Sequence, residues 1–192
     1  YFMISAILLA AGQSKRLKSE NKLIKLYKKK PLIYHSLKAL QKSKVNKVII
    51  VLGHQHKVVK KMIKKNQKNI FIFNRNYKKG MASSIKTGLK KISKSDKGFL
   101  VVQSDMPFIK SSDINKICNS IKSKKFLVYA LKFRNRIGNP IGFDISIVKK
   151  FKKMDGDVGA KFMVKRLKKE TKFIKVLTKR VFKDLDLRKD FN

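Results

Sequence analysis

Cysteine and long apolar runs are scarce in this chain. The one cysteine, Cys118, cannot form an internal disulfide or a cysteine-rich metal site, which fits a reducing compartment. It falls on the apolar face of a predicted helix, so we expect a buried thiol. Charge or glycine interrupts every apolar run before it could cross a membrane, and residues 2–11 lack a basic leader. We therefore expect a cytoplasmic protein without a membrane span.

Acidic residues are also scarce, and the formal net charge is +39. Such a basic surface would ordinarily favour nucleic acid as a partner. A recognition surface, however, gathers its basic residues on one face and uses many arginines, whereas here lysine is spread over the whole length and arginine is sparse. We favour the composition bias of an AT-rich genome and expect no specific nucleic-acid partner. A basic nucleic-acid-binding protein is the remote alternative.

Short apolar runs alternate with amphipathic segments along the first two thirds of the chain. The runs predict buried parallel strands, and apolar residues at helical spacing between them predict crossover helices. The predicted strands cover residues 4–11, 48–52, 70–73, 99–102 and 126–131. This alternation predicts one α/β domain over residues 3–192, with a Rossmann-like, doubly wound, mostly parallel sheet and helices on both faces. Farther on we expect a turn at 138–140, a helix near 156–167 and a strand near 173–177.

The first predicted strand runs directly into Leu9-Ala10-Ala11-Gly12, with Arg16 and Lys22 shortly after it. Small residues let the backbone approach a bulky anion with its N–H groups aimed at phosphate oxygens, while the two cations supply compensating charge. The pattern predicts a phosphate-binding loop over residues 9–22, although it matches neither the Walker motif nor the dinucleotide fingerprint. The alternative is a tight turn with surface cations.

Asp105 follows the fourth predicted strand, at the carboxyl edge of the sheet beside the first loop. A lone carboxylate there suits Mg²⁺, which keeps several waters and bridges triphosphate oxygens. Because its sequence neighbours include few cations, we expect a metal rather than a salt bridge as its partner. The alternative is a helix cap or turn before Pro107. Asp184 or Asp186 could provide a second carboxylate.

Several short motifs occur in a fixed order along the chain. They are Leu9-Ala10-Ala11-Gly12 with Arg16 and Lys22, Gly53-His54, Gly80-Met81-Ala82-Ser83-Ser84, Asp105-Met106-Pro107, Gly138-Asn139-Pro140, Gly156-Asp157-Val158-Gly159-Ala160 and Asp184-Leu185-Asp186. In order and spacing they resemble the molybdenum cofactor cytidylyltransferases, within the larger group of cofactor nucleotidyltransferases. The resemblance covers almost the whole chain.

This resemblance implies a Mg²⁺-dependent enzyme that transfers CMP from CTP to the terminal phosphate of molybdopterin and releases pyrophosphate. The backbone at residues 9–12 would cradle the triphosphate, and Arg16 would face its β and γ groups. Lys22 would stabilise charge on the α-phosphoryl oxygens in the transition state, and Asp105 would hold the metal. A molybdoenzyme that receives the product is a candidate partner.

The resemblance also bears on the base and the acceptor. Guanylyl members usually carry a second glycine where Ala11 stands and a Pro-Leu pair near residues 81–84, so we expect CTP in preference to GTP. Gly80, Ser83 and Ser84 become candidate nucleotide contacts, although the serines could merely cap a helix. The acceptor would lie against residues 133–170, approximately. Another phosphorylated acceptor, or the use of GTP, is the alternative.

Departures from the family pattern limit what the resemblance can assign. Lys161 stands where an arginine is usual, which keeps the charge but loses the bidentate fork. Arg134 and Arg136 could face an anionic pterin phosphate or form a solvated turn. A Thr-Pro pair that is usual after Asp186 is missing, so the second metal ligand stays open between Asp184 and Asp186.

Overall fold

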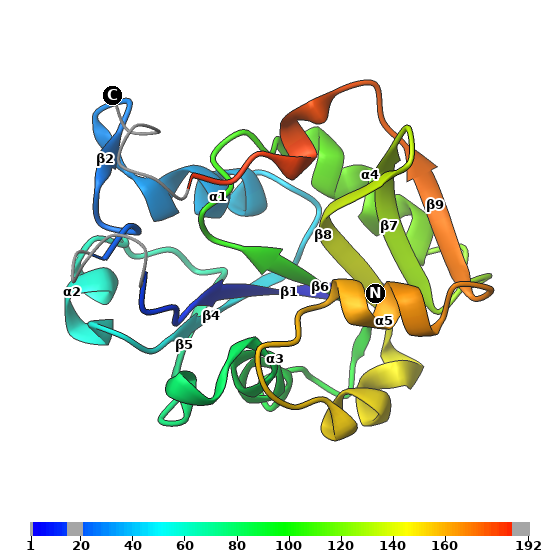
Figure 1. The fold of residues 1–192 in the computed structure, drawn as a ribbon, viewed down its shortest axis with the longest axis horizontal. Helices are drawn as coiled ribbons and strands as arrows, with labels where there is room; N and C mark the ends of the chain where they lie inside the picture. The colour runs from blue at the N-terminus through cyan, green and yellow to red at the C-terminus, as the bar shows by residue number, and fades with distance from the viewer. Residues whose placement is uncertain (1, 15–20, 186–192) are drawn as a thin grey trace.

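The computed structural model describes residues 2–14 and 21–185, which form a seven-stranded sheet with helices on both faces (Figure 1). The strand order is β5-β4-β1-β6-β8-β7-β9. The strands are β1 (Met3–Ala10), β4 (Lys47–Leu52), β5 (Asn69–Phe73), β6 (Asp96–Gln103), β7 (Val128–Phe133), β8 (Arg136–Asp144) and β9 (Thr171–Lys175). A short hairpin of β2 (Leu26–Tyr27) and β3 (Lys30–Pro31) stands apart from this sheet.

Five α-helices and three 3-10 helices complete the described part of the chain. They are α1 (Leu32–Gln41), α2 (His56–Lys61), η2 (Tyr77–Lys79), α3 (Met81–Leu89), α4 (Ser111–Ile121), η3 (Ile145–Lys153), α5 (Lys161–Arg166) and η4 (Lys179–Phe182). No helix in the described residues is long and apolar enough to cross a membrane. The predicted α/β architecture, with a mostly parallel sheet and helices on both faces, is confirmed.

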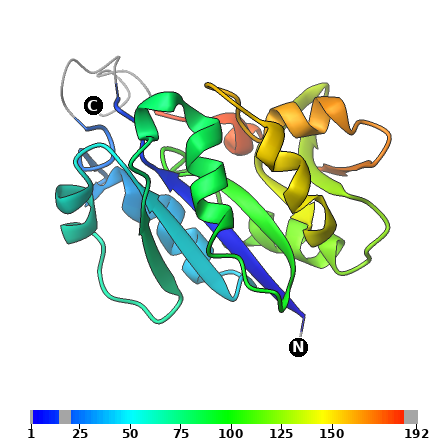
Figure 2. The same cartoon turned by 90° about the horizontal axis from the view of Figure 1, so that it is seen from below.

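The two helical layers bury separate cores. On one face, α1, α2 and α4 pack their apolar sides against Ala6, Leu8 and their neighbours. On the other, α3 covers β1 and β4, η3 covers β6 and β8, and α5 covers β7, around a core that includes Ile7, Ile49 and Val51; Figure 2 shows α3 and η3 lying across this face. Because both faces of β1 and β4 are covered, these strands are apolar along almost their whole length. Cys118 lies fully buried in the first core, as the sequence predicts.

The sheet has a parallel half and a mixed half. Strands β5, β4, β1 and β6 run parallel to one another. Strand β8 is antiparallel to both β6 and β7, and β9 is parallel to β7. The β7–β8 hairpin therefore places β8 between two strands that precede it in the sequence.

The turn predicted at residues 138–140 is wrong, because these residues belong to β8 and the chain reverses just before Arg136 instead. The register shifts there: Ala130 pairs with Ile141 but Lys132 pairs with Ile137, so β8 has extra residues opposite β7. Glycine and proline suit such a bulge as well as a turn.

The helix predicted near residues 156–167 is also shorter than expected. Only Lys161–Arg166 is α-helical, because Gly156 has a left-handed φ of 67° and the residues after it form a loop. This loop contacts the start of α3, as described below.

Candidate nucleotide site

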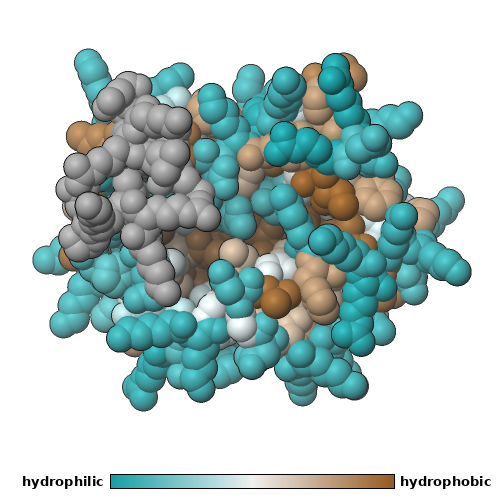
Figure 3. All heavy atoms as spheres, viewed as in Figure 1, coloured by the Kyte–Doolittle hydropathy of each residue, from teal (hydrophilic) through white to brown (hydrophobic). Residues whose placement is uncertain are grey.

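A cavity of about 540 Å³ opens at the carboxyl ends of β1 and β6. In Figure 3 the middle of the visible face is hollowed, with apolar side chains inside and hydrophilic ones around the rim. The first loop, the segment 77–84 and the residues after β6 all contribute to its lining. The predicted site residues that line it are Leu9, Ala11, Gly12, Lys22, Gly80, Ser84 and Asp105. The parallel topology thus brings together side chains that are distant in the sequence.

The first loop is held by contacts from the end of β4. The backbone N–H of His54 donates to the carbonyl of Ala11 at 3.2 Å. A β-carbon on Gly53 would come within 2.7 Å of Ala11 and of Tyr77, so only glycine fits this approach. A β-carbon on Gly12, by contrast, would meet nothing within 4 Å. The backbone at Gly12 is therefore open to a bulky ligand in the cavity.

The other residues of the loop have different surroundings. Ala10 is buried in the core and does not line the cavity. Ser14 has a left-handed φ of 52°, and its hydroxyl accepts a hydrogen bond from the backbone N–H of Lys22 at 3.1 Å. Ser14 thereby ties the first part of the predicted phosphate loop to its last residue, Lys22. Arg16 lies outside the described residues.

An ion pair joins the loop to the end of β6. The Nζ of Lys22 lies 2.5 Å from Oδ2 of Asp105, and the two side chains are only 16% and 17% exposed. The expectation that Asp105 would have no salt-bridge partner is therefore wrong, because the fold brings Lys22 to it across a long sequence separation. The hydroxyl of Ser104 donates to the carbonyl of Leu9 at 2.6 Å, which fastens β6 to β1 beside this pair.

The second oxygen of Asp105 has a different environment. Oδ1 is buried and accepts no hydrogen bond from any described residue. A buried carboxylate oxygen without a donor is costly, and a cation can compensate it. Within residues 2–14 and 21–185, no cluster of three or more His, Cys, Asp or Glu side chains could hold a metal. The donor set fits a hard cation that takes most of its ligands from water and substrate phosphates.

The start of α3 forms the opposite wall and contacts the loop after η3. Gly80 has a φ of 97°, and a β-carbon there would lie 2.4 Å from the backbone of Gly156. The backbone N–H of Met81 donates to Oδ1 of Asp157 at 3.2 Å, and that of Ala82 donates to the carbonyl of Gly156 at 3.2 Å. Asp157 thus satisfies an N–H that the first turn of α3 leaves without a helical partner.

The two candidate serines are placed differently. Ser84 lines the cavity and accepts a hydrogen bond from Nδ2 of Asn74 at 3.0 Å. Ser83 does not line it: its hydroxyl accepts from the same amide at 2.9 Å and donates to the carbonyls of Asn76 and Gly80. Ser83 therefore fastens the turn before α3, whereas Ser84 is open to a ligand.

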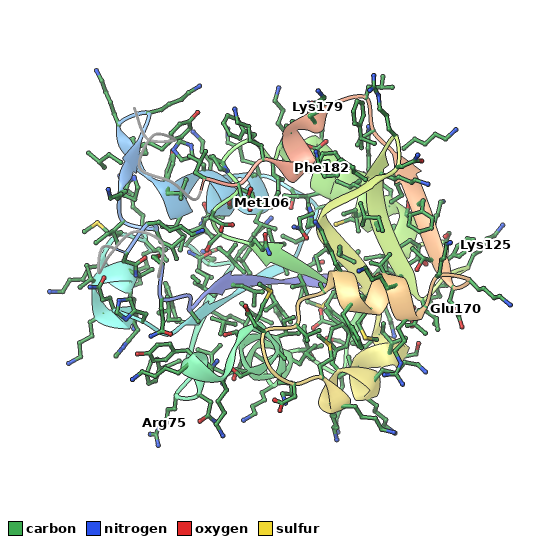
Figure 4. The ribbon with its side chains drawn as sticks, in the orientation of Figure 1. Arg75, Met106, Lys125, Glu170, Lys179 and Phe182 are labelled. Atoms are coloured by element: carbon green, nitrogen blue, oxygen red, sulfur yellow. The ribbon has the colours of Figure 1, made fainter. Side chains whose placement is uncertain are left out.

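A second cavity of about 260 Å³ adjoins the first and shares Leu9, Met81 and Gln103 with it. Met106 and Phe182, labelled in Figure 4, line it from the residues after β6 and from η4. Nδ2 of Asn139 donates to Oε1 of Gln103 at 3.3 Å across its wall. Asn139 belongs to the region of residues 133–170 that we expect on the acceptor side.

Two charged side chains, Lys161 and Asp184, also line the second cavity. The pKa of Lys161 lies below its ordinary value, because partial burial disfavours the cation more than the nearby Asp184 favours it. Asp184 thus faces the second cavity rather than the first, and Asp186 lies outside the described residues. Arg134 and Arg136 line neither cavity; they lie over the rings of Phe133 and Phe182.

Some lining residues received no role from the sequence. They are Tyr77, Lys78, Lys79, Gln103 and Asp157. Each stands beside or inside a motif that the sequence analysis singled out: three precede Gly80, one precedes Ser104-Asp105, and one belongs to the Gly156–Ala160 motif. Extending the motifs by a few residues would have found the first four, and Asp157 was already inside a motif.

Comparisons with known proteins show the family of this chain. A family model described as the MobA-like NTP transferase domain matches residues 6–171. The chain is 34% identical over 139 residues to the 2-C-methyl-D-erythritol 4-phosphate cytidylyltransferase of Lachnoclostridium phytofermentans, covering 70% of this chain and 58% of that protein. It is 29% identical over 139 residues to the bifunctional protein GlmU of Clostridioides difficile, covering 72% of this chain and 29% of that protein. The chain thus aligns with only part of each relative's length.

Solved structures share the fold over nearly the whole chain. The Rv0371c protein of Mycobacterium tuberculosis H37Rv has a TM-score of 0.86 at 18% identity, covering 99% of this chain and 96% of that one. A nucleotidyl transferase from Methanothermobacter has a TM-score of 0.82 at 18% identity, covering 98% of this chain and 94% of that one. The more specific resemblance to molybdenum cofactor cytidylyltransferases stays a prediction. Because the family model matches residues 6–171, which include the first loop, Asp105 and most of the sheet, the chain belongs to the MobA-like NTP transferase domain family.

Proposed function

We propose that the protein is a cytidylyltransferase that moves CMP from CTP onto the terminal phosphate of a small acceptor. The observation that carries this proposal is the Lys22–Asp105 pair inside the larger cavity, at the edge where the first loop exposes the backbone of Gly12. A cation and a carboxylate at this position suit a triphosphate and its metal. Family membership supports the same chemistry.

In the proposed reaction, an oxygen of the acceptor phosphate forms a bond to the α-phosphorus of CTP. The bond from that phosphorus to the bridging oxygen breaks, and pyrophosphate leaves with the electron pair. The backbone of residues 11–12 would hold the triphosphate, and Lys22 would stabilise charge on the α-phosphoryl group as it develops. Arg16, from the same loop, is proposed to face the β and γ groups. No covalent enzyme intermediate is needed, because positioning and electrostatics suffice.

Asp105 would hold Mg²⁺ through its buried Oδ1, and Asp184, or else Asp186, is the proposed second ligand. When bound, the metal would neutralise charge on the pyrophosphate leaving group. Lys22 and the metal would then compete for the same carboxylate. We therefore propose that Lys22 turns from Asp105 toward the α-phosphoryl group when the nucleotide binds.

Two observations support CTP as the nucleotide. Ala11 lies against Gly53 and lines the cavity, where guanylyl members usually carry a glycine. The relative from Lachnoclostridium phytofermentans is named a cytidylyltransferase. Gly80 and Ser84 are the proposed contacts to the base or ribose, whereas the hydroxyl of Ser83 is engaged within its own turn.

Two phosphate monoesters are candidate acceptors. The order of motifs favours molybdopterin, with a molybdoenzyme as the recipient of the product. The name of the relative at 34% identity favours 2-C-methyl-D-erythritol 4-phosphate. Both would present a terminal phosphate from the second cavity, beside Lys161.

The test is to incubate the protein with each of the four triphosphates, Mg²⁺ and either acceptor, scoring pyrophosphate release and the mass of the product. We expect release that needs CTP, an acceptor and Mg²⁺, and that stops with EDTA. Equal or faster turnover with GTP would remove the cytidine assignment. Absence of transfer with both acceptors would show that neither is the substrate. The Lys22→Ala variant is the matched negative control.

A further inference from the structure

The segment of residues 178–185, which follows β9, crosses the functional edge of the sheet (the red part of the ribbon in Figure 1). Val181 is fully buried and packs against Gly138, where a β-carbon would come within 2.6 Å of it. Phe182 and Asp184 line the second cavity. The backbone N–H of Leu185 donates to the carbonyl of Asp105 at 3.1 Å. The segment therefore forms one wall of the second cavity and touches the main chain of the predicted metal ligand.

A bidentate ion pair anchors this segment. Nε and Nη2 of Arg180 donate to Oδ2 and Oδ1 of Asp113, both at 2.8 Å. Asp113 is completely buried, in the first turn of α4, and it also accepts a hydrogen bond from the backbone N–H of Lys110 at 3.1 Å. The pKa of Arg180 is raised by its hydrogen bonds to Asp113. A fork of this kind fixes both the distance and the orientation of the guanidinium.

Neither Arg180 nor Asp113 lines either cavity. Their contribution must therefore act through the residues that follow Arg180. Weaker contacts also hold those residues: the guanidinium of Arg136 lies 4.9 Å from the ring centre of Phe182, and Nζ of Lys183 lies 4.8 Å from that of Phe108. The Arg180 fork is the charged, geometrically specific anchor among the contacts of the described segment.

We infer that the Asp113–Arg180 pair is a positioning device for the acceptor half of the site. It sets the path of residues 178–185 so that Phe182 and Asp184 face the second cavity. It also keeps the N–H of Leu185 on the carbonyl of Asp105. Since no residue of this segment lines the first cavity, the pair controls binding of the phosphorylated acceptor, and it can reach CTP only through the metal that Asp184 is proposed to share with Asp105. The inference rests on the proposed function.

The choice of variants must avoid simple unfolding. Arg180→Ala would leave the buried carboxylate of Asp113 without its partner and destabilise the protein. Arg180→Lys keeps a cation beside Asp113 but loses the fork, and Asp113→Asn removes the charge while keeping the size. The matched control is Asp96→Asn. Asp96 is also buried, but it lies at the start of β6, at the end away from the two cavities, where it accepts a hydrogen bond from the hydroxyl of Ser5 at 2.9 Å.

Two measurements test the inference. Steady-state kinetics should show the KM for the acceptor rising about tenfold in Arg180→Lys and Asp113→Asn, and calorimetry without Mg²⁺ should show the Kd for CTP unchanged. Amide exchange followed by NMR should show the N–H of Leu185 losing protection in the same two variants. Asp96→Asn should lower the melting temperature but leave the acceptor KM and the protection of the Leu185 amide unchanged.

An unchanged acceptor KM would overturn the inference, and so would an equal loss of affinity for CTP and for the acceptor. A wild-type protein that transfers CMP to no acceptor would overturn the proposed function, and this is scored before any variant is compared. The exchange of the Leu185 amide would then still decide whether the pair holds the segment, and unchanged protection would refute that too.

Discussion

The parallel and mixed halves of the sheet bring side chains to the edge that carries the two cavities by different means. In the parallel half, β1, β4 and β6 end at the same edge, so the loops that follow them meet there: Gly12, Gly53 and Asp105 all lie at carboxyl ends of strands. In the mixed half, β8 runs the other way, so its beginning, near Asn139, lies at this edge. Asp184 arrives through a segment beyond β9.

The first cavity is therefore formed by the topology of the parallel strands, whereas the second depends on individual contacts. Loops that follow parallel strands need only the sheet itself to bring them together. The wall of the second cavity depends on the Arg180–Asp113 fork and on Val181 against Gly138. We therefore expect changes in the parallel half to affect the chemical step, and changes in the mixed half to affect placement of the acceptor.

The largest effect is expected for Asp105→Asn. The change removes the charge that would anchor the metal and also the partner of Lys22, while size is preserved. Activity should fall by orders of magnitude, and the fold should survive because the side chain faces the cavity. Pyrophosphate release at rising Mg²⁺ measures the activity, and thermal melting measures whether the fold survives. Asp96→Asn, at the other end of β6, is the control. Near wild-type activity would reduce Asp105 to a turn residue.

Lys22→Ala comes next. A cation that faces the α-phosphoryl group contributes most in the transition state, so kcat should fall about 100-fold while the KM for CTP changes little. Lys97→Ala is the matched control, because Lys97 is exposed at the amino end of β6. A raised KM with an unchanged kcat would assign Lys22 to ground-state binding instead.

Gly80→Ala tests the junction between the halves. The β-carbon would lie 2.4 Å from the Gly156 backbone, and the φ of 97° is strained for alanine. The free energy of unfolding should drop by about 1–3 kcal/mol. Gly12→Ala, whose β-carbon meets nothing within 4 Å, should keep its stability and weaken CTP binding. Denaturant unfolding of the two variants measures this difference. A similar loss in the free energy of unfolding in both variants would refute it.

The smallest effect concerns α4, which packs against the mixed half and carries both Asp113 and Cys118. Burial raises the pKa of Cys118 to about 12. The folded state therefore keeps this proton above pH 9, whereas the unfolded thiol ionises near pH 8.5. Between about pH 8.5 and 12 the unfolded state binds fewer protons, so the free energy of unfolding falls as pH rises.

This contribution should be absent from Cys118→Ala. Urea unfolding of both proteins from pH 7 to 10 would show the difference in slope, and identical slopes would contradict the raised pKa. Thiol reagents at pH 8 should label Cys118 in the unfolded protein only.

The parallel half was largely predictable from the sequence. Its strands are short apolar runs and its helices have apolar residues at helical spacing, so local pattern determines each element. From these alone, the phosphate loop and Asp105 were expected at one edge, and the structure places Leu9, Gly12 and Asp105 in one cavity. The mixed half was less predictable, because the signal at residues 138–140 fits a bulge as well as a turn.

The sequence by itself determined the order of elements, the alternation of strands and helices, and the residue types available for phosphate chemistry. Only the tertiary structure decided which side chains meet. Lys22 pairs with Asp105, Met81 with Asp157 and Arg180 with Asp113, at sequence separations of 83, 76 and 67 residues. Local propensity carries no information about such pairs. They form because the strand order brings the loops to one edge, where burial makes an unpaired charge or N–H costly.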